Sequence, residues 1–460
     1  MTRNLSIFES LFMIATMRIG FRFQVKGSLT GEKILKTLRC IYQHQPSLQR
    51  RPKKDEETKG YIYEQCSFEE SIILEELVLD QKDKEQFVEV LEEKKKQITD
   101  VEDRKVYVMF LKNTTNLNGE HQICVLVDHI NFDARSCLSF VSDFMRFIDF
   151  NEKEKQKIEN EIVPLSPKDF NFTLQAQSTQ FQGPTKFYGY KPEIVNQVLG
   201  PIPDHKPPLE KDPEFSGTNE YGYTATSKYR QLIFNLDEEL TVNFIEKCKQ
   251  HSAKPTAVLT AILLSSINLF WHKGKCSNSR PGLVVDSRTH YAKPFPQDYI
   301  GCFFWVTEIE ELDLNEETAF WDYCLKIQKE LDFQLENGCI IKNIKYMAEN
   351  KEARSFGFPN SSHINNYGCY EKLGYCSRNG DYLLTDINFA AFGFPPLRNI
   401  QVVAFSFNGK LRIKPLFSPC VYKQETILNW MMNSFLKILK QITLSSDDLV
   451  LINLDSDQLN

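Results

Sequence analysis

The chain has 460 residues, of which 42% are hydrophobic and 12% aromatic, and its formal net charge is −6. This composition can build two domains of ordinary size or one large two-lobed body. The negative charge provides no general attraction to nucleic acid or to an anionic membrane surface, so neither partner is expected. No run of about 18 apolar residues occurs, and no transmembrane segment is expected.

The 12 cysteines are placed singly, without a C-x-x-C pair. In a long chain of mixed composition they are typical of reduced thiols in an intracellular protein, and a cytoplasmic location is expected. A mitochondrial location is the alternative, because Arg3 and Arg18 flank a short apolar centre near the start of the sequence. Glu9 and the shortage of further arginine and serine argue against such a presequence.

Hydrophobic periodicity predicts alternating strands and helices in the first part of the chain. Thr30 is the expected N-cap of the first helix, and Pro46 stops that helix. The glutamate and lysine runs of a second helix are expected to face solvent. In chain order, the predicted elements are a strand over 19–25, a helix over 30–45, a charged helix over 80–100 and paired strands over 106–111 and 123–127.

The last of these strands ends abruptly in polar residues. Ile123 to Val127 has the pattern of a buried strand, and Asp128, His129 and Asp133 follow it before a helical pattern begins. α/β proteins often carry their reactive residues at such strand ends, facing a cleft. This position therefore makes His129 a candidate for chemistry, with a satisfied core histidine as the alternative.

Residues 151–228 contain nine prolines and lose the periodic pattern. This composition predicts a long, partly extended crossover between an N-terminal lobe over 1–150 and a C-terminal lobe over 229–460. In the second lobe a helix that is apolar on all sides predicts a core helix, and Asn408-Gly409 predicts a hairpin turn. The predicted elements there are a strand over 229–236, helices from Asp237 and over 257–271, strands over 282–288 and 299–306, a helical region over 315–346, the hairpin and a closing helix over 425–442.

The segment from Asp128 to Ala134 resembles the H-H-x-x-x-D-G motif of the chloramphenicol-acetyltransferase-like acyltransferases, the HxxxD type. This superfamily includes alcohol O-acetyltransferases, which this chain most resembles, and peptide-synthetase condensation domains. His129 and Asp133 match the second histidine and the aspartate, whereas Asp128 and Ala134 replace the first histidine and the glycine. Because an H-x-x-x-D string alone is weak support, the similarity elsewhere in the chain matters.

The resemblance extends from Phe8 to Ile442. Gly282–Arg288 is similar to a family strand that ends in arginine, and Tyr299–Val306 is similar to the turn and strand that follow it. The second family motif, D-F-G-W-G, survives only as the aromatic–glycine turn around Gly393, without the tryptophan.

The resemblance implies an α/β fold of two similar lobes, each a mixed β-sheet with flanking helices, and an inter-lobe tunnel. It also implies acyl-CoA as co-substrate, with no tightly bound cofactor. His121 and His129 have no third ligand nearby, so no metal is expected. The expected reaction is acyl transfer to a small alcohol or amine acceptor. His129 is its general base, since a neutral imidazole suits that role near pH 7.

The other site residues are assigned supporting roles. By the resemblance, Asp133 pairs with Arg288 and holds the histidine loop in place, and an incidental surface charge is the alternative for Arg288. Asp128 is expected to raise the basicity of the imidazole, and the methyl group of Ala134 to narrow the acceptor side.

For the oxyanion of the tetrahedral intermediate, Asn388 or Thr385 is the candidate donor, and ordinary loop residues are the alternative.

Two further interpretations remain open. A catalytically silent member of the same fold could serve as a structural or binding subunit of a larger complex. Ala134 and the degraded second motif favour it, and the intact His129 and Asp133 disfavour it. A free-standing condensation domain acting on carrier-bound acyl groups is the third interpretation, and it is disfavoured because no carrier domain is recognised in the sequence.

Overall fold

The computed structural model forms two compact units, each built on a six-stranded sheet with flanking helices. This confirms the predicted α/β class with two lobes. Unit 1 comprises Met1–Gln175, Phe295–Phe303 and Cys369–Gly393, and unit 2 comprises Ala176–Pro294, Phe304–Gly368 and Phe394–Asn460. The structure describes residues 3–4, 18–54, 61–78, 87–98, 105–112, 119–150, 232–273, 278–279, 282–290, 295–309, 312–313, 319–340, 362–392, 400–417 and 422–445.

The six-stranded sheet of unit 1 has the order β14-β15-β2-β7-β6-β5. Neighbouring strands are antiparallel except for β5 and β6, which are parallel. The predicted pairing of the strands over 106–111 and 123–127 is confirmed. The strands are β14 (Arg378–Asn379), β15 (Tyr382–Phe392), β2 (Arg18–Lys26), β7 (Glu120–Asp128), β6 (Val106–Lys112) and β5 (Ile72–Val78).

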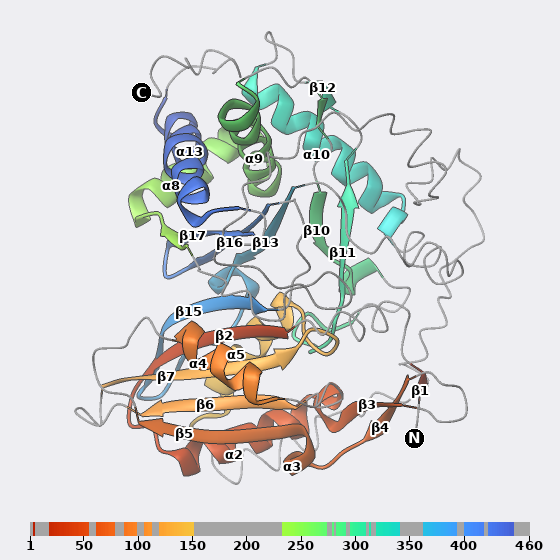
Figure 1. Ribbon diagram of the computed structural model, residues 1–460, viewed down its shortest axis with the longest axis vertical. Coiled ribbons are helices and arrows are strands. Elements are labelled where there is room, and N and C mark those ends of the chain that lie inside the picture. The colour runs from red at the N-terminus through yellow and green to blue at the C-terminus, as the bar shows by residue number, and fades with distance from the viewer. Residues whose placement is uncertain are drawn as a thin grey trace. The chain divides into compact units, whose positions relative to one another are not determined.

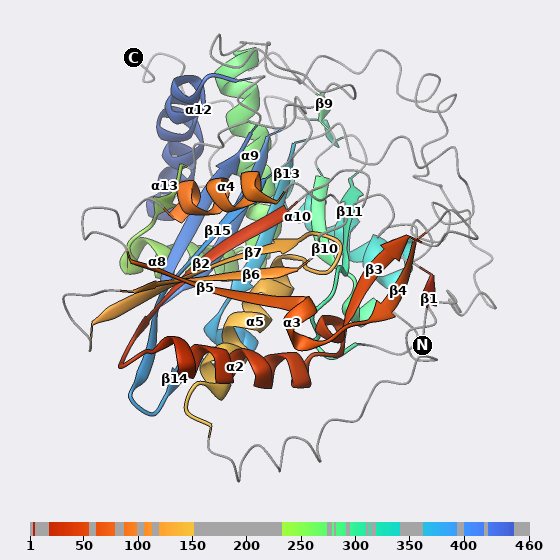
Figure 2. The ribbon, with the colours of Figure 1, turned by 60° about the horizontal axis from the view of Figure 1, so that its bottom comes forward.

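Helices cover both faces of this sheet, α2 and α5 on one face and α4 on the other (Figure 2). Side chains of β2 alternate between the two faces of the sheet. On the first face the ring centroid of Phe21 lies 5.7 Å from that of Phe140 of α5. On the other face Leu91 of α4 packs against Cys124 and Leu126 of β7. The helices are α2 (Gly31–His44), α3 (Phe68–Ser71), α4 (Phe87–Gln97), α5 (Ala134–Phe147) and the 3₁₀ turns η1 (Pro46–Gln49) and η4 (Glu371–Leu373).

The start of α2 agrees with its prediction, because Thr30 is its N-cap and the Thr30 hydroxyl accepts a hydrogen bond from the backbone N–H of Lys33. A small sheet of order β1-β4-β3 completes unit 1. Its strands are β1 (Arg3–Asn4), β4 (Tyr61–Gln65) and β3 (Arg50–Lys54).

The continuous lobe expected over 229–460 needs a correction. Two of its segments, Phe295–Phe303 and Cys369–Gly393, belong to unit 1. The main reason is strand pairing: β15 takes β2 as its antiparallel neighbour from Leu383 to Phe392. Figure 1 shows the blue β15 beside the red β2. The predicted crossover over 151–228, the first part of the charged helix and Gly393 lie outside the described residues.

The six-stranded sheet of unit 2 has the order β11-β10-β13-β16-β17-β8. β10 is parallel to β13 and antiparallel to β11. The predicted hairpin is confirmed, since Asn408 and Gly409 join β16 to β17 with φ angles of 49° and 70°. The strands are β11 (Phe304–Glu308), β10 (Gly282–Asp286), β13 (His363–Cys369), β16 (Gln401–Phe407), β17 (Lys410–Leu416) and β8 (Phe234–Asn235), with a separate pair β9 (Asn278–Ser279) and β12 (Leu312–Asp313).

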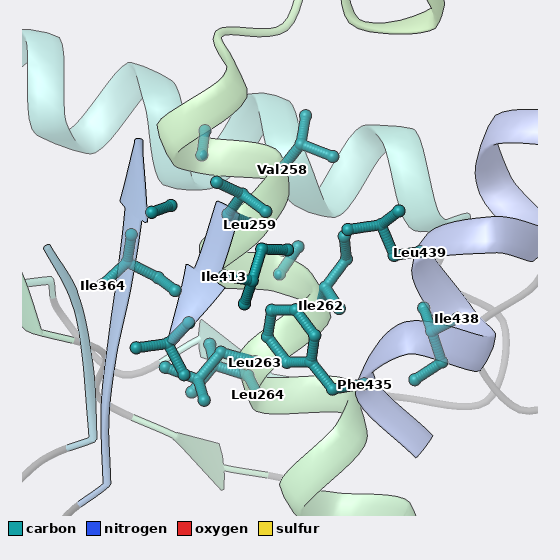
Figure 3. Packing of buried hydrophobic residues seen from close by; sticks show 14 of the residues in the cluster. Val258, Leu259, Ile262, Leu263, Leu264, Ile364, Ile413, Phe435, Ile438 and Leu439 are labelled. Carbon is teal, nitrogen blue, oxygen red and sulfur yellow. The ribbon is translucent and has the colours of Figure 1, made fainter. Parts of the chain in front are cut away.

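The core of unit 2 forms around α9, the helix predicted to be apolar on all sides. Its residues Val258 and Ile262 pack with Ile413 of the sheet and with Phe435 and Leu439 near the end of the chain (Figure 3). By length and composition α9 could cross a membrane, but 61% of it is buried in the protein, as in a core helix. The helices are α8 (Glu238–Gln250), α9 (Pro255–His272), the 3₁₀ turn η2 (Arg288–His290), α10 (Phe320–Glu336), α12 (Gln424–Trp430), the π-helical turn η5 (Met431–Phe435) and α13 (Leu436–Leu444).

Candidate active site at the end of strand β7

Asp128, the last residue of β7, shapes the turn that carries His129. Its backbone carbonyl accepts hydrogen bonds from the N–H groups of Asn131 and Phe132, both at 3.2 Å. Its carboxylate Oδ1 accepts another from the N–H of Ile130 at 3.0 Å. Asp128 is buried and lies opposite the buried Arg18 across the β2–β7 pair. Asp128 is therefore part of the turn itself.

His129 is buried, with 8% of its surface exposed. Burial lowers the pKa of its imidazole below the ordinary 6.5. Hydrogen bonds with its own backbone and that of Phe132, and the carboxylates of Asp133 and Asp128, oppose this effect in part. The carboxylate of Asp128 thus acts toward a higher pKa, and its predicted role in raising the basicity of the imidazole stays a prediction. The outcome is a neutral imidazole at pH 7, which is the form that can accept a proton.

Asp133 is the N-cap of α5. Its Oδ1 accepts a hydrogen bond from the N–H of Ser136 at 2.7 Å, and its Oδ2 accepts one from the N–H of Phe303 at 2.9 Å. Its own N–H donates to the carbonyl of Gly301 at 3.2 Å. The carboxylate therefore secures both the start of α5 and a segment that arrives from about 170 residues later in the chain.

Ser136 ties the same segment to the helix a second time. Its Oγ accepts a hydrogen bond from the N–H of Gly301 at 2.9 Å. The single hydroxyl proton serves one of two acceptors, the Gly301 carbonyl at 2.6 Å or Asp133 Oδ1 at 2.8 Å. A Cβ at position 301 would lie 2.2 Å from the ring of Phe303, so a larger residue there requires that ring to move. Between these anchors, Cys302 places its Sγ 4.0 Å from His129 Nδ1.

α5 carries a buried polar stripe that the sequence-based prediction missed. The stripe consists of Ser136, Ser139, Ser142 and Asp143. The Ser139 hydroxyl lies 3.1 Å from that of Tyr375, and Ser142 Oγ accepts a hydrogen bond from the N–H of Cys376 at 2.9 Å. The stripe therefore contacts segments from 295–303 and 369–393, in addition to the β15–β2 pairing that ties the second segment to unit 1. The only sequence signal was polar residues recurring on a helix that is otherwise apolar.

Arg288 follows β10 in unit 2 and is completely buried. Its Nη1 donates a hydrogen bond to Asp286 Oδ1 at 2.9 Å, and its backbone N–H donates to the same oxygen at 3.1 Å. Burial excludes the alternative of an incidental surface charge. The predicted pairing of Arg288 with Asp133 would connect residues of different units, and it stays a prediction. The inter-lobe tunnel also stays a prediction. Ala134 is the first residue of α5 and is partly exposed, and its effect on an acceptor also stays a prediction.

Asn388 and Thr385 lie within unit 1, on β15. Asn388 of β15 pairs with Arg22 of β2, and Arg22 pairs with Cys124 of β7. Cys124 precedes Asp128 by four residues on β7. Asn388 is therefore two strand spacings and four residues along the strand from Asp128, a distance of about 16 Å. The Thr385 hydroxyl lies farther away and donates to the carbonyl of Gln24 at 3.4 Å. An oxyanion donor must lie within a few ångströms of the atoms that the base serves, so this separation argues against that role for both residues.

The ten cysteines of the described residues are free thiols. Burial raises the pKa of Cys66 to about 11 and of Cys124 and Cys248 to about 12, so these thiols are poor nucleophiles. Cys302 and Cys376 are partly exposed. Within the described ranges no cluster of three or more histidine, cysteine, aspartate or glutamate side chains is suited to a metal ion.

No family model matches the chain, and a search of curated proteins finds no match. Solved structures do resemble it over nearly its whole length. The trichothecene 15-O-acetyltransferase TRI3 from Fusarium sporotrichioides has a TM-score of 0.69 at 12% identity, covering 96% of this chain and 95% of that one. The starter condensation domain of rhizomide synthetase RzmA, a mutant form in complex with C8-CoA, has a TM-score of 0.65 at 12% identity, with 99% and 97% covered.

The epimerization domain from the third module of tyrocidine synthetase B has a TM-score of 0.65 at 13% identity, with 96% of this chain and 98% of that one covered. These three proteins carry out different reactions, and at identities of 12–13% the likeness shows the fold alone. The chain therefore has the two-lobed fold that condensation and epimerization domains share with an acetyltransferase.

Proposed function

We propose that the chain is an acyl-CoA-dependent acyltransferase that transfers an acyl group to an alcohol, with His129 as general base. The observation that carries this proposal is the state of His129, a buried imidazole whose pKa is lowered by burial. The turn that carries it is held by Asp128, and Asp133 caps the helix that follows. Support also comes from the fold, which is shared with an acetyltransferase and with a domain solved in complex with C8-CoA.

In the proposed reaction the acceptor hydroxyl gives its proton to His129 as its oxygen attacks the thioester carbonyl carbon. The tetrahedral intermediate collapses by breaking the carbon–sulfur bond. The imidazolium returns the proton to the leaving thiolate, and the products are an ester and free coenzyme A. No covalent enzyme intermediate forms in this reaction. Asp133 holds the turn and takes no part in the chemical step.

The test is release of free coenzyme A from acetyl-, hexanoyl- and octanoyl-CoA with a panel of alcohols and amines. We expect His129→Ala to lower kcat/KM by a factor of about 10² to 10⁴. His290→Ala is the matched control, because burial also lowers the pKa of His290, which lies in unit 2. Circular dichroism establishes that both variants fold. Equal rates in His129→Ala and wild type would remove the base assignment.

The pH dependence gives a second test of the same base. Because burial lowers the His129 pKa below 6.5, more than half of the imidazole is neutral at pH 6.5. The rate should therefore fall on the acid side with a midpoint below pH 6.5. An acidic limb centred above pH 6.5 in kcat/KM would contradict the proposed protonation state.

The alternatives are outcomes of the same assay. Transfer from an acyl group on a carrier protein, but not from acyl-CoA, would support a free-standing condensation domain. No transfer from either donor, with stable co-purification of other subunits, would support a catalytically silent subunit of a larger complex. A cytoplasmic location, with the mitochondrion as alternative, stays a prediction that fluorescence microscopy of the tagged chain can test.

A further inference from the structure

Gln45, at the end of α2, makes three hydrogen bonds with its buried side-chain amide. Only 2% of its surface is exposed. Its Nε2 donates to Asp143 Oδ2 at 2.7 Å and to the carbonyl of Asp298 at 3.1 Å. Its Oε1 accepts a hydrogen bond from the N–H of Ile300 at 3.2 Å. Both amide protons and the amide oxygen are thus committed to α5 and to the segment 295–303.

The base of this side chain is fixed as well. The N–H of Gln45 donates to the carbonyl of Ile41 at 2.9 Å, and its own carbonyl accepts from the N–H of Leu48 at 3.0 Å. Pro46 follows and restricts the backbone further. The amide of Gln45 is therefore presented from a rigid point, the junction of α2 with the 3₁₀ turn η1.

Asp143 and Ser136 lie on a single helix face, where Asp143 supports Gln45 and Ser136 binds the segment directly. They are seven residues apart on α5, two helical turns, so their side chains project in similar directions. Gln45 with Asp143 fixes residues 298–300, and Ser136 with Asp133 fixes residues 301–303. The segment is consequently secured at two points on either side of the Ile300–Gly301 bond.

Aromatic packing connects residues 298–300 with residues 301–303. The ring centroids of Phe295 and Phe303 lie 4.7 Å apart, and those of Tyr299 and Phe303 lie 5.8 Å apart. Tyr299, Ile300 and Phe303 are each buried. A shift at 298–300 therefore displaces Phe303 and the adjacent Cys302, whose Sγ lies beside His129.

We propose that Gln45, backed by Asp143, is a positioning residue for His129. It sets the place of residues 298–303 and so the contacts of Cys302 and Asp133 beside the imidazole. The effect on transfer rests on the function proposed above, whereas the effect on the position of the segment does not. Gln45 touches neither the imidazole nor a reacting group in this assignment.

The test compares Gln45→Ala with Gln49→Ala. Gln49 is a matched control, because its Nε2 donates to the carbonyls of Tyr42 and Gln43 at the end of the same helix. The first readout needs no activity. The rate of N-ethylmaleimide addition to Cys302 is measured by peptide mass spectrometry and divided by the rate at Cys376, which Ser142 holds. We expect this ratio to change by a factor of roughly three or more in Gln45→Ala and to stay near wild type in Gln49→Ala.

The second readout is transfer kinetics in the coenzyme A assay. Misplacement of a supporting segment reduces the chemical step, so kcat of Gln45→Ala should fall about tenfold. The KM for acyl-CoA should change by less than about twofold, because the variant removes no substrate contact in this assignment. Gln49→Ala should retain both constants.

Asp143 supplies a conservative comparison if Gln45→Ala does not fold. Asp143→Asn keeps a side-chain oxygen that can accept from Gln45 Nε2, whereas Asp143→Ala removes it. The cysteine ratio should stay near wild type in Asp143→Asn and shift in Asp143→Ala. Equal behaviour of these two variants overturns the inference, as does equal behaviour of Gln45→Ala and Gln49→Ala. A shifted ratio in a protein that transfers no acyl group overturns the proposed function and leaves the positional inference standing.

Discussion

α5 of unit 1 and α9 of unit 2 both pack against a six-stranded sheet, yet their buried hydroxyl groups have different partners. In α9 the Thr260 hydroxyl donates to the carbonyl of Thr256 and the Ser266 hydroxyl to that of Leu263, both within the helix. From elsewhere in the described residues, the indole of Trp430 donates to Ser266, and the side-chain amide of Asn366 donates to Thr256, which is partly exposed. In α5, Ser136 and Ser142 instead bind backbone groups 165 and 234 residues away in the chain.

This difference shows what each helix contributes. α9 is surrounded by apolar side chains and stabilises unit 2 by burying them. α5 uses an apolar face for packing and a polar stripe for collecting segments around His129. Hydrogen bonds have directional geometry and hydrophobic contacts have little, so a polar stripe can set the position of a loop where apolar contacts alone would leave it adjustable.

Ile262→Ala in α9 should have the largest effect on stability and should leave the chemistry unchanged. Ile262 is completely buried, and removing its outer carbons leaves a cavity that costs about 2–5 kcal/mol. Urea unfolding measures the loss, and the coenzyme A assay measures kcat per folded molecule. A lower kcat in fully folded Ile262→Ala would contradict the proposed difference between α9 and α5, since α9 would then influence the candidate active site.

Asp143→Asn should change how stability depends on pH. Burial raises the pKa of Asp143 to about 7, so the folded protein holds this proton more tightly than the unfolded chain between about pH 4 and 7. The contribution is fully present below pH 4 and is lost as the pH rises to 7, up to roughly 4 kcal/mol at 1.36 kcal/mol per pKa unit. Above pH 7 the difference between wild type and variant should be constant.

The measurement is urea unfolding of both proteins from pH 4 to 8. Asp149→Asn is the control, because Asp149 is an exposed partner of Lys33 just after the same helix. It shows the effect of neutralising a carboxylate that is not buried. Parallel pH curves for wild type and Asp143→Asn would show that Asp143 does not hold a proton in the folded state at neutral pH.

Ser136→Ala and Ser142→Ala should each have a local effect, at a different cysteine. Each leaves a backbone N–H without its acceptor, that of Gly301 or of Cys376, at a cost of about 1–3 kcal/mol. Alkylation should then increase at Cys302 in the first variant and at Cys376 in the second. If both variants raised both rates equally, the stripe would be a general stabiliser and not a set of separate anchors.

Thr260→Val in α9 should have the smallest effect. Its hydroxyl donates at 2.8 Å to a carbonyl of its own helix, and valine has nearly the same shape. We expect a stability change of less than about 1 kcal/mol by urea unfolding, with unchanged alkylation at Cys302. A loss above about 2 kcal/mol would show that α9 also depends on its polar atoms and would weaken the contrast with α5.

Most elements of both units could be predicted from local patterns. The cap Thr30, the start of a helix at Asp237, the core helix α9 and the Asn408-Gly409 hairpin agree with the structure. The last helix differs from its prediction at one place, where a π-helical turn interrupts the region expected as one helix. Capping, periodicity and turn chemistry act over a few residues, which is why a single sequence displays them.

The candidate site was only partly predictable. His129, Asp128 and Asp133 stand in one short motif, and the structure brings them together at the end of β7. The register of β15 argues against the roles suggested for Asn388 and Thr385, because it carries both residues away from that corner. Gln45 and the stripe on α5 were missed, because most of their partners are backbone atoms, which any residue type would offer at those positions.

By itself, the amino-acid sequence determined the strand end that carries His129, since this follows from hydrophobic period and from residues close together in the chain, and its family resemblance and proline-rich stretch implied the α/β class and the two lobes. Only the tertiary structure decided that residues 295–303 and 369–393 belong with the first unit. That choice depends on hydrogen bonds between atoms more than a hundred residues apart, such as those joining Ser136 to Gly301 and Gln45 to Ile300. No pattern in a single sequence records which distant backbone group a buried side chain will meet.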